Sequence, residues 1–367
     1  MTQPSETRAG VWRLVTMLSL LCCGTAFADR PSASLKEKTT KPAAGRANSQ
    51  KRQPMHLNNP YFSLRIQTES LPYGVYVNGA PLTADQTGGP SNETWPINHM
   101  LRSTGDNEIA FVAPPYEDDH GKGAFEKTAK ATLTVLVQEA GQLDKPGLPV
   151  MKLCFVGSRA GTPRATEGSS PEGRFDSTRE FTSSKTGDVS VGKPTVRALN
   201  AQGVLWISRT FSANLSLPEW EFLTSDVMPN FLEDAPSEAE AERIYADLLA
   251  AYETVWKGLK SGNIDSILPL FEERSRNTDR AFYLNPGTTQ QRLKDSFLEV
   301  LKDRSMTLQP IRIEDFWSIE TAPRGRLMRL VTGEHSSAIL RFEDKDGLSL
   351  VYPVTFRRKG GKYIIAL

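Results

Sequence analysis

The sequence predicts two folded parts, an all-β sandwich followed by an α+β domain, behind an N-terminal stretch that belongs to neither. Three observations support this division. The length of 367 residues exceeds the usual size of one domain and allows two. The hydrophobic pattern changes from short alternating runs before residue 217 to helical periods after residue 237. The 27 glycines and 24 prolines indicate many turns and little continuous helix.

Residues 1–28 have the pattern of a secretory signal peptide. Arg8 and Arg13 precede an apolar run from Leu14 to Cys23, and Ala26-Phe27-Ala28 is a small-x-small cleavage site. We therefore expect cleavage after Ala28 and a periplasmic or secreted protein with no transmembrane segment. An uncleaved anchor is the first alternative, although the apolar run is shorter than the ~20 residues that span a bilayer. A lipoprotein signal is the second, although its cysteine normally follows a small residue.

Residues 29–57 are expected to form a disordered basic tail. Positions 29–55 contain seven basic and two acidic residues and almost no large apolar side chain whose burial could offset the entropy of ordering. The tail lacks the aromatic residues of a single-strand nucleic-acid site, so we expect no nucleic-acid partner. The whole chain, with 44 basic and 43 acidic residues, is not a uniformly basic binder either.

Residues 58–217 are expected to form an antiparallel sandwich. Phe62, Leu64 and Ile66 alternate with polar neighbours. The run Val75–Val77 ends at Asn78-Gly79, a strong hairpin dipeptide. Further strands are expected at 109–112, 132–137, 150–156 and 204–211. A Gly-, Ser- and Thr-rich stretch at about 157–195 interrupts this pattern, and we expect it to be a mobile insertion.

Residues 218–236 are expected to link the sandwich to an α+β domain at 237–367. Ser237 and Glu240 have the spacing of a capping box, and an apolar stripe follows at helical steps. Gly262-Asn263 should end this first helix. Two more helices are expected at 264–273 and 289–301, and strands at 308–313, 326–331, 337–342, 348–356 and 362–367. This order predicts helices packed on one face of a curved antiparallel sheet.

Three segments of the first part follow a recurring turn pattern. Gly74–Gly79 ends a strand in Asn-Gly, Pro96–Leu101 is a short connecting segment, and Gly105–Ile109 is a Gly-x-Asn turn into another strand. This order resembles the galactose-binding-like jelly-roll modules that are attached to glycoside hydrolases. The resemblance covers about 50 residues and implies a jelly-roll-like sandwich.

Aromatic residues of the same part are candidates for ligand binding. Flat aromatic faces can stack on sugars, but the same side chains also serve as core residues, and the sequence does not fix their direction. The candidates for a stacking platform are Tyr73, Tyr76, Trp95 and Tyr116.

The segment Tyr252–Asp265 has a helix ending in which Gly-Asn leads directly into a second helix. With the element order that follows, it is similar to the cone-shaped NTF2-like family over about 130 residues. Enzymes of that family place an acidic or histidine base on the sheet inside the cone, although many relatives are not enzymes. The resemblance implies as candidate bases Glu314, Asp315, Glu334 and His335.

Two further groups of polar residues are candidates for binding. Asp118-Asp119-His120 could offer oxygen and nitrogen ligands to a divalent metal, but the flanking prolines and glycines favour a solvated loop, so we expect no metal or other cofactor. The second group would form a basic edge on the last strands, suited to an acidic partner or, alternatively, protecting the edge from aggregation. Its members include Arg324, Arg326, Arg357 and Arg358.

Known catalytic motifs are missing from the sequence, including the Gly-x-Ser-x-Gly elbow, His-Glu-x-x-His and the phosphate-binding loop. The sequence therefore favours an exported, non-catalytic binding protein whose partner is a protein or an envelope component. An immunity-type inhibitor of a periplasmic toxin is a more specific form of this hypothesis. The alternatives are a small-molecule enzyme or ligand-binding protein using the C-terminal cone, and cell-wall or carbohydrate binding by the sandwich.

Overall fold

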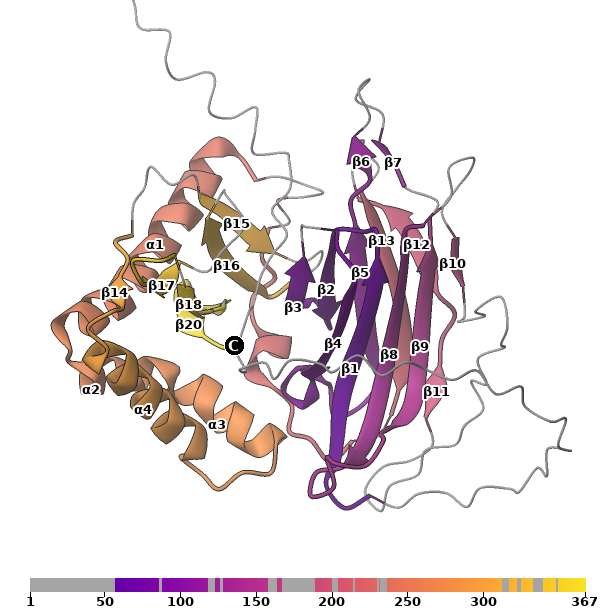
Figure 1. Ribbon diagram of the computed structural model, residues 1–367, viewed down its shortest axis with the longest axis horizontal. Helices are drawn as coiled ribbons and strands as arrows, with labels where there is room; N and C mark the ends of the chain where they lie inside the picture. Colours follow the sequence, from indigo (N-terminus) through magenta and orange to yellow (C-terminus); the bar gives the residue numbers. More distant parts are fainter. Residues whose placement is uncertain are drawn as a thin grey trace, which may run out of the picture.

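A computed structural model describes most of the chain after residue 56 (Figure 1). The described residues are 57–85, 88–117, 123–125, 128–157, 164–166, 189–199, 204–213, 215–229, 231, 236–311, 317–321, 325–332, 339–347 and 349–367. The expected signal peptide, the tail up to residue 56 and most of the expected insertion lie outside these ranges. In the described part no helix is both long enough and apolar enough to cross a membrane.

The fold is rich in β-structure, and every strand pair in it is antiparallel. The strands of the first part are β1 (Pro60–Glu69), β2 (Tyr73–Val77), β3 (Ala80–Asp85), β4 (Ser91–Pro96), β5 (Asp106–Ala113), β6 (Tyr116–Glu117), β7 (Gly123–Ala124), β8 (Lys130–Glu139), β9 (Leu148–Val156), β10 (Arg164–Thr166), β11 (Ser190–Val191), β12 (Thr195–Ala198) and β13 (Leu205–Ser212). One sheet has the order β10-β9-β8-β1-β4, and the other has the order β11-β13-β5-β2-β3, with β12 also pairing with β13. The strands β6 and β7 form a separate ribbon.

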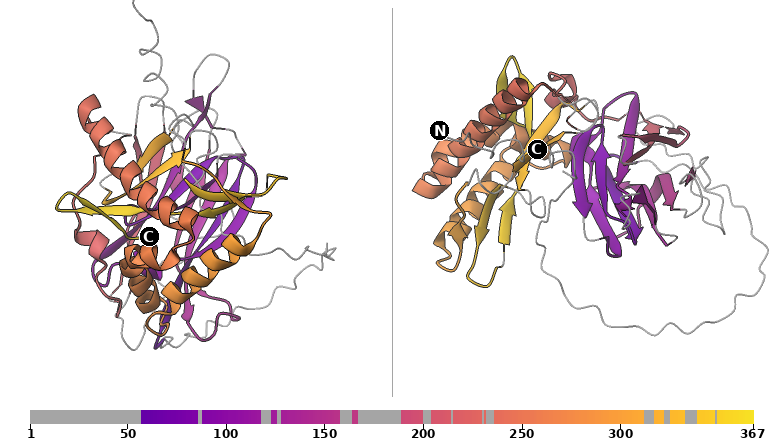
Figure 2. Two further views of the ribbon diagram at one scale, coloured as in Figure 1. Left: turned by 90° about the vertical axis from the view of Figure 1, so that its left-hand side faces the viewer. Right: turned by 90° about the horizontal axis from the view of Figure 1, so that it is seen from above.

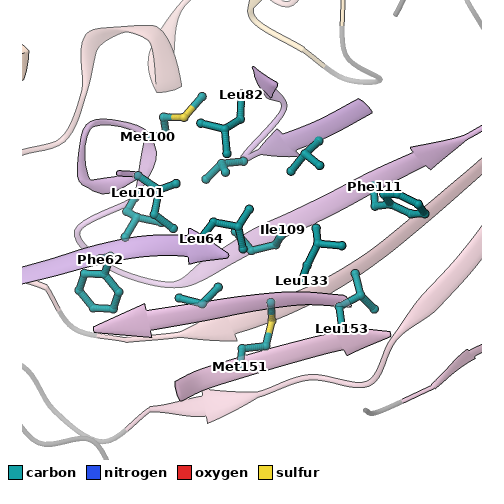
Figure 3. Close-up of a cluster of buried hydrophobic side chains, with 14 of the residues drawn as sticks. Phe62, Leu64, Leu82, Met100, Leu101, Ile109, Phe111, Leu133, Met151 and Leu153 are labelled. Carbon is teal, nitrogen blue, oxygen red and sulfur yellow. The ribbon is translucent and has the colours of Figure 1, made fainter. Parts of the chain in front are cut away.

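The two larger sheets pack face to face, and the apolar side chains between them form one core (Figure 3). Phe62 on β1 stacks against Phe211 on β13, with ring centroids 6.3 Å apart. Along β1, Phe62, Leu64 and Ile66 are buried and Arg65 is exposed, as the alternation predicts, whereas Ser63 is buried as well. The β2–β3 hairpin turns at Asn78-Gly79, where both residues have positive φ, as a tight primed turn requires.

The second part carries the helices and the remaining strands, and it lies beside the sandwich in Figure 1 and in the right-hand view of Figure 2. Its helices are α1 (Glu238–Ser261), α2 (Ile264–Ile267), the 3₁₀ helix η4 (Leu268–Phe271), α3 (Glu272–Ala281) and α4 (Thr288–Lys302). Its strands are β14 (Thr307–Leu308), β15 (Trp317–Thr321), β16 (Leu327–Thr332), β17 (Leu340–Glu343), β18 (Ser349–Tyr352), β19 (Phe356–Lys359) and β20 (Lys362–Ile365). They form two sheets, β15-β16-β19-β20 and β14-β17-β18.

Helix α1 begins and ends as the sequence predicts and is fixed to the sheet by a tyrosine. The Ser237 side chain accepts a hydrogen bond from the Glu240 N–H at 3.4 Å, and Gly262 closes the helix in the left-handed conformation. The Tyr252 hydroxyl donates to the Val354 carbonyl at 2.6 Å and accepts from the Leu330 N–H at 3.3 Å. The Tyr252 hydroxyl therefore both donates and accepts a hydrogen bond inside the core.

Three elements, α2, η4 and α3, stand in place of the single second helix expected at 264–273. Pro269 stands at the start of η4, where its missing N–H interrupts the helical hydrogen bonds and separates α2 from α3. Helix α3 then continues to Ala281, well past the predicted end. This extension brings the C-terminal end of α3 against the sandwich.

The segment expected to link the two parts is packed against both of them. It contains η3 (Glu221–Thr224), and Trp220, Phe222 and Leu223 are buried in the sandwich core. Leu327 and Ala366 of the second part belong to the same apolar cluster. The hydrophobic core is therefore continuous between the two parts.

Candidate functional site

The aromatic residues proposed for stacking lie in different environments. Tyr73 is 1% exposed, its ring stacks on Phe111 with centroids 6.3 Å apart, and its hydroxyl donates to Ser91 Oγ at 3.1 Å. Tyr76 points to the opposite face of β2, where it packs on the Trp206 ring at 5.4 Å. These two tyrosines are core residues, because neither presents a ring face to solvent.

Trp95 and Tyr116 are the other two aromatic candidates. Trp95 is partly buried, and its indole N–H donates to the Glu93 carboxylate at 2.8 Å. The backbone of Tyr116 belongs to β6, and its side chain lies outside the described part of the structure. The structure therefore places one candidate, Trp95, on the rim of the sandwich core.

The arginines of the expected basic edge make contacts within the chain. Arg357 is 4% exposed, and its guanidinium donates two hydrogen bonds to the Glu273 carboxylate, one of them at 2.6 Å. These bonds raise the pKa of Arg357 above its ordinary value, so the guanidinium stays charged. Arg326 donates to the Ser225 carbonyl, and Arg358 lies 3.7 Å from the Asp226 carboxylate. Three of the four arginines thus hold α3 and the connecting segment to the last strands, whereas Arg324 lies outside the described residues.

The interior of the second part is occupied by aromatic rings. Tyr352 packs on Phe297 with centroids 4.8 Å apart and on Phe342 at 6.0 Å, and Tyr252 meets Phe356 at 5.0 Å. Burial raises the pKa of Tyr352, whose hydroxyl pairs with Ser296 Oγ at 2.9 Å. The side chains that meet in this interior are thus mostly apolar, and the hydroxyls of Tyr252 and Tyr352 are hydrogen-bonded.

The candidate bases and metal ligands fall in segments that the structure does not describe. These residues are Glu314, Asp315, Glu334 and His335 for catalysis and Asp118, Asp119 and His120 for a metal. Among the residues that are described, no group of three or more histidine, cysteine, aspartate or glutamate side chains could hold a metal ion. These assignments therefore stay predictions.

Asn98, in the 3₁₀ helix η2 (Asn98–Met100), joins the sandwich to the C-terminal end of α3. It is fully buried, and its side-chain oxygen accepts from the Phe62 N–H at 2.6 Å. Its amide nitrogen donates to the carbonyls of Pro60 and Ala281, both at 2.9 Å. Tyr283, just beyond α3, donates a further bond to the Pro60 carbonyl at 3.1 Å. We call this region the joint.

Phe282 fills the apolar side of the joint. Its ring lies between Tyr61, at 5.6 Å, and His99, at 5.4 Å. Burial and the nearby charge of Arg274 lower the pKa of His99 to about 4, so the imidazole is neutral at physiological pH. The buried His99 Nδ1 has no hydrogen-bond partner among the described residues. The joint thus combines the hydrogen bonds of Asn98 and Tyr283 with an uncharged contact around Phe282, and together they hold α3 against β1 and η2.

A groove lies on α3, beside the loop that leads to α4. It has a volume of about 420 Å³, within the ~300–1,000 Å³ of small-ligand pockets. Most of its lining side chains are polar or charged, and they come from α3, the loop and the first turn of α4. They are Glu272, Ser275, Arg276, Asp279, Arg280, Leu284, Pro286, Gly287 and Gln290.

Asp279 holds the two walls of this groove together. Helix α4 begins after Gly287, which has φ +85° and offers no capping side chain. The Asp279 carboxylate accepts instead from the Gly287 N–H at 2.7 Å, the Thr289 N–H at 2.8 Å and the Thr289 hydroxyl. An anion at a helix N-terminus also interacts favourably with the helix dipole. The Asp279 carboxylate therefore has a structural role, and its charge is not available to a ligand.

Three polar groups of the groove remain without a partner in the described part of the chain. Ser275 is 2% exposed, yet its hydroxyl makes no hydrogen bond. Arg280 and Glu272 are exposed at the rim, and no hydrogen bond or ion pair joins them to another described residue. Arg276, by contrast, donates to the Glu221 carboxylate at 2.7 Å. The groove therefore offers one buried hydroxyl, one free cation and one free anion.

Sequence reasoning missed this groove because the predicted helix ended at residue 273. The signal that could have found it is charge spacing, since Glu272, Arg276 and Arg280 follow one another at steps of four. Comparisons with known proteins provide no template for the site. No family model, no curated protein and no solved structure matches this chain.

Proposed function

We propose that this chain is an exported, non-catalytic binding protein that recognises a polypeptide partner through the groove beside α3. The observation that carries this proposal is the buried Ser275 hydroxyl, which has no partner and lines a groove with fixed walls. Buried polar groups are normally hydrogen-bonded, and an unsatisfied one in a groove is a position for a ligand atom. Because α3 is held by both the joint and Asp279, little ordering free energy would oppose binding.

Export and the finer fold belong to the same proposal. The signal pattern of residues 1–28 supports cleavage after Ala28 and a periplasmic or secreted location. The face-to-face sheets support a jelly-roll-like sandwich, and the helices packed on antiparallel strands support an NTF2-like cone. An immunity-type inhibitor of a periplasmic toxin is the narrower form, in which the groove receives a toxin segment. N-terminal sequencing of the exported protein tests the first point, since the expected first residue is Asp29.

The alternative functions have less support. A small-molecule enzyme in the cone needs interior space, and the rings of Phe297 and Tyr352 meet there at 4.8 Å. Carbohydrate stacking on the sandwich needs exposed rings, and Tyr73 is a core residue. A polypeptide in the groove needs only the groups that the groove already presents.

A crosslinking experiment and a matched pair of variants on α4 test the groove. A photo-crosslinking residue at Gln290, which lines the groove, should capture the partner, and one at Leu143, exposed in a turn of the sandwich, should not. The affinity of the captured partner is then measured by calorimetry. Gln290→Trp fills the groove and should weaken binding at least tenfold, whereas Gln291→Trp, on the exposed side of α4, should leave it unchanged. Equal affinities for these two variants would count against the groove.

A further inference from the structure

Resting on the proposed function, we infer that the groove binds an extended peptide segment that carries an acidic and a basic side chain three or four residues apart. The acidic side chain pairs with Arg280, and the basic side chain pairs with Glu272. The peptide backbone between them satisfies the Ser275 hydroxyl.

The charges that select this ligand are those that the fold leaves free. The Asp279 carboxylate already accepts three hydrogen bonds from the start of α4, and Arg276 is paired with Glu221 at 2.7 Å. Arg280 and Glu272 have no such partner among the described residues, and both line the groove. A ligand with both signs of charge is therefore more complementary to the rim than a ligand with one sign.

The spacing of the two free charges sets the spacing on the ligand. Glu272 and Arg280 are eight residues apart on α3, which corresponds to about 12 Å at 1.5 Å per residue. An extended chain advances by about 3.3 Å per residue, so that distance spans three or four residues. Adjacent opposite charges on a peptide would reach only one end of the groove.

Ser275 indicates what lies between the charges. A hydroxyl inside a helix commonly bonds to the carbonyl four residues earlier, as Thr278 does to Arg274 at 2.9 Å. Ser275 makes no such bond, although it is almost completely buried. Rotation of the Ser275 side chain toward the groove would bring its hydroxyl within reach of a backbone N–H or carbonyl of a peptide laid along α3. Satisfying this group would offset the penalty of leaving it unpaired.

The test uses the mature protein and labelled peptides measured by fluorescence anisotropy. The probe is an alanine-based heptapeptide with Asp and Lys four positions apart, prepared in both orders. One control peptide replaces the charged residues by Asn and Gln, and another places Asp and Lys side by side. One order of the spaced peptide should bind about tenfold more tightly than both controls, and added salt should weaken it. Equal binding of the neutral peptide would overturn the inference.

Charge-reversal variants test whether the groove selects a peptide that carries both signs of charge. Arg280→Glu should weaken the spaced peptide about tenfold, because attraction is replaced by repulsion, whereas Arg292→Glu, exposed on α4 outside the groove, should not. The double variant with Glu272→Lys should prefer the opposite order of charges. If Arg280→Glu behaves like Arg292→Glu, the ligand class is wrong.

The partner captured at the groove distinguishes the two proposals. If Gln290→Trp weakens that partner while the charge reversals leave it unchanged, the binding function stands and the charged-peptide inference falls. If neither change has an effect, both fall. Circular dichroism of each variant checks that the exposed substitutions leave the fold intact.

Discussion

Replacing Asn98 by alanine should separate the sandwich from α3 more effectively than any other single change in the joint. The side chain satisfies three backbone groups at once, the Phe62 N–H and the carbonyls of Pro60 and Ala281. Its position after Pro96, where the β1–β4 ladder stops, lets an amide side chain take over from backbone pairing. Truncation to alanine removes all three bonds without changing any charge.

The magnitude follows from which groups lose their partner. The Pro60 carbonyl keeps its bond from Tyr283, whereas the Phe62 N–H and the Ala281 carbonyl lose the side-chain partner they have. Each buried backbone group left unsatisfied costs about 1–3 kcal/mol. Water entering the space left by the amide would recover part of this, so we expect Asn98→Ala to lower the free energy of unfolding by about 3 kcal/mol.

Equilibrium urea unfolding, followed by tryptophan fluorescence and far-ultraviolet circular dichroism, measures this loss. Asn98→Asp keeps the acceptor but cannot donate to the two carbonyls, so it should be at least as destabilising. Asn92→Ala, at an exposed position of the edge strand β4, is the matched control and should change stability by less than ~0.5 kcal/mol. A loss below ~1 kcal/mol for Asn98→Ala would refute the assignment of the joint to this side chain.

Acidification should weaken the joint through His99, whose pKa is lowered to about 4 from its ordinary 6.5. The contribution of His99 to the free energy of unfolding is complete above pH 6.5 and is lost as the pH falls toward 4, by up to about 3 kcal/mol. The free energies of unfolding at pH 7.5 and pH 4.5 should therefore differ less in His99→Gln than in the wild type. Glu273→Gln leaves Arg357 buried without its ionic partner and should lower the free energy of unfolding by about 3–5 kcal/mol in the same urea assay. Gly258→Ala places a methyl 2.1 Å from an isoleucine carbon of α2 and should lower the melting temperature, whereas Gly141→Ala, with nothing within 4 Å, should not.

For each of these three predictions, one result would contradict the reasoning. Parallel pH profiles for the wild type and His99→Gln would show that another group governs the acid sensitivity. A change below ~1 kcal/mol for Glu273→Gln would show that Arg357 finds another partner. Equal melting temperatures for the alanine variants of Gly258 and Gly141 would show that α2 moves aside without cost.

Features with a local cause were predictable from the sequence. The alternation along β1 and the Asn78-Gly79 turn each depend on a few neighbouring residues, and both are found. Helix α1 shows its apolar stripe and both caps within its own sequence. These are elements in which propensity, pattern and tertiary packing agree.

The groove was not predictable, because its helix buries polar residues. Ser275, Asn277 and Asp279 are each no more than 5% exposed, although pattern reading assigns such residues to a solvent face. The partners of Asn277 and Asp279 come from η3 and from the start of α4, which only the tertiary structure brings near. Strand β3 follows the predicted Asn78-Gly79 hairpin turn, but nearly all of its residues are buried, so no alternation marks its extent.

The joint also has a consequence for how the chain folds. Its hydrogen bonds connect residues 183 and 223 positions apart, so they add strongly to the contact order of the protein. Ribosomes add about 5–20 residues per second, so roughly 10–45 s separate the synthesis of Pro60 from that of Tyr283. Once β4 and β8 have been made, β1 can pair within the sandwich and Asn98 can donate to the Pro60 carbonyl, but the bond from Tyr283 must wait for the second part of the chain. We therefore expect the sandwich to form first, as an intermediate in which the surface that later contacts α3 is uncovered. Folding should finish only after the helices are made.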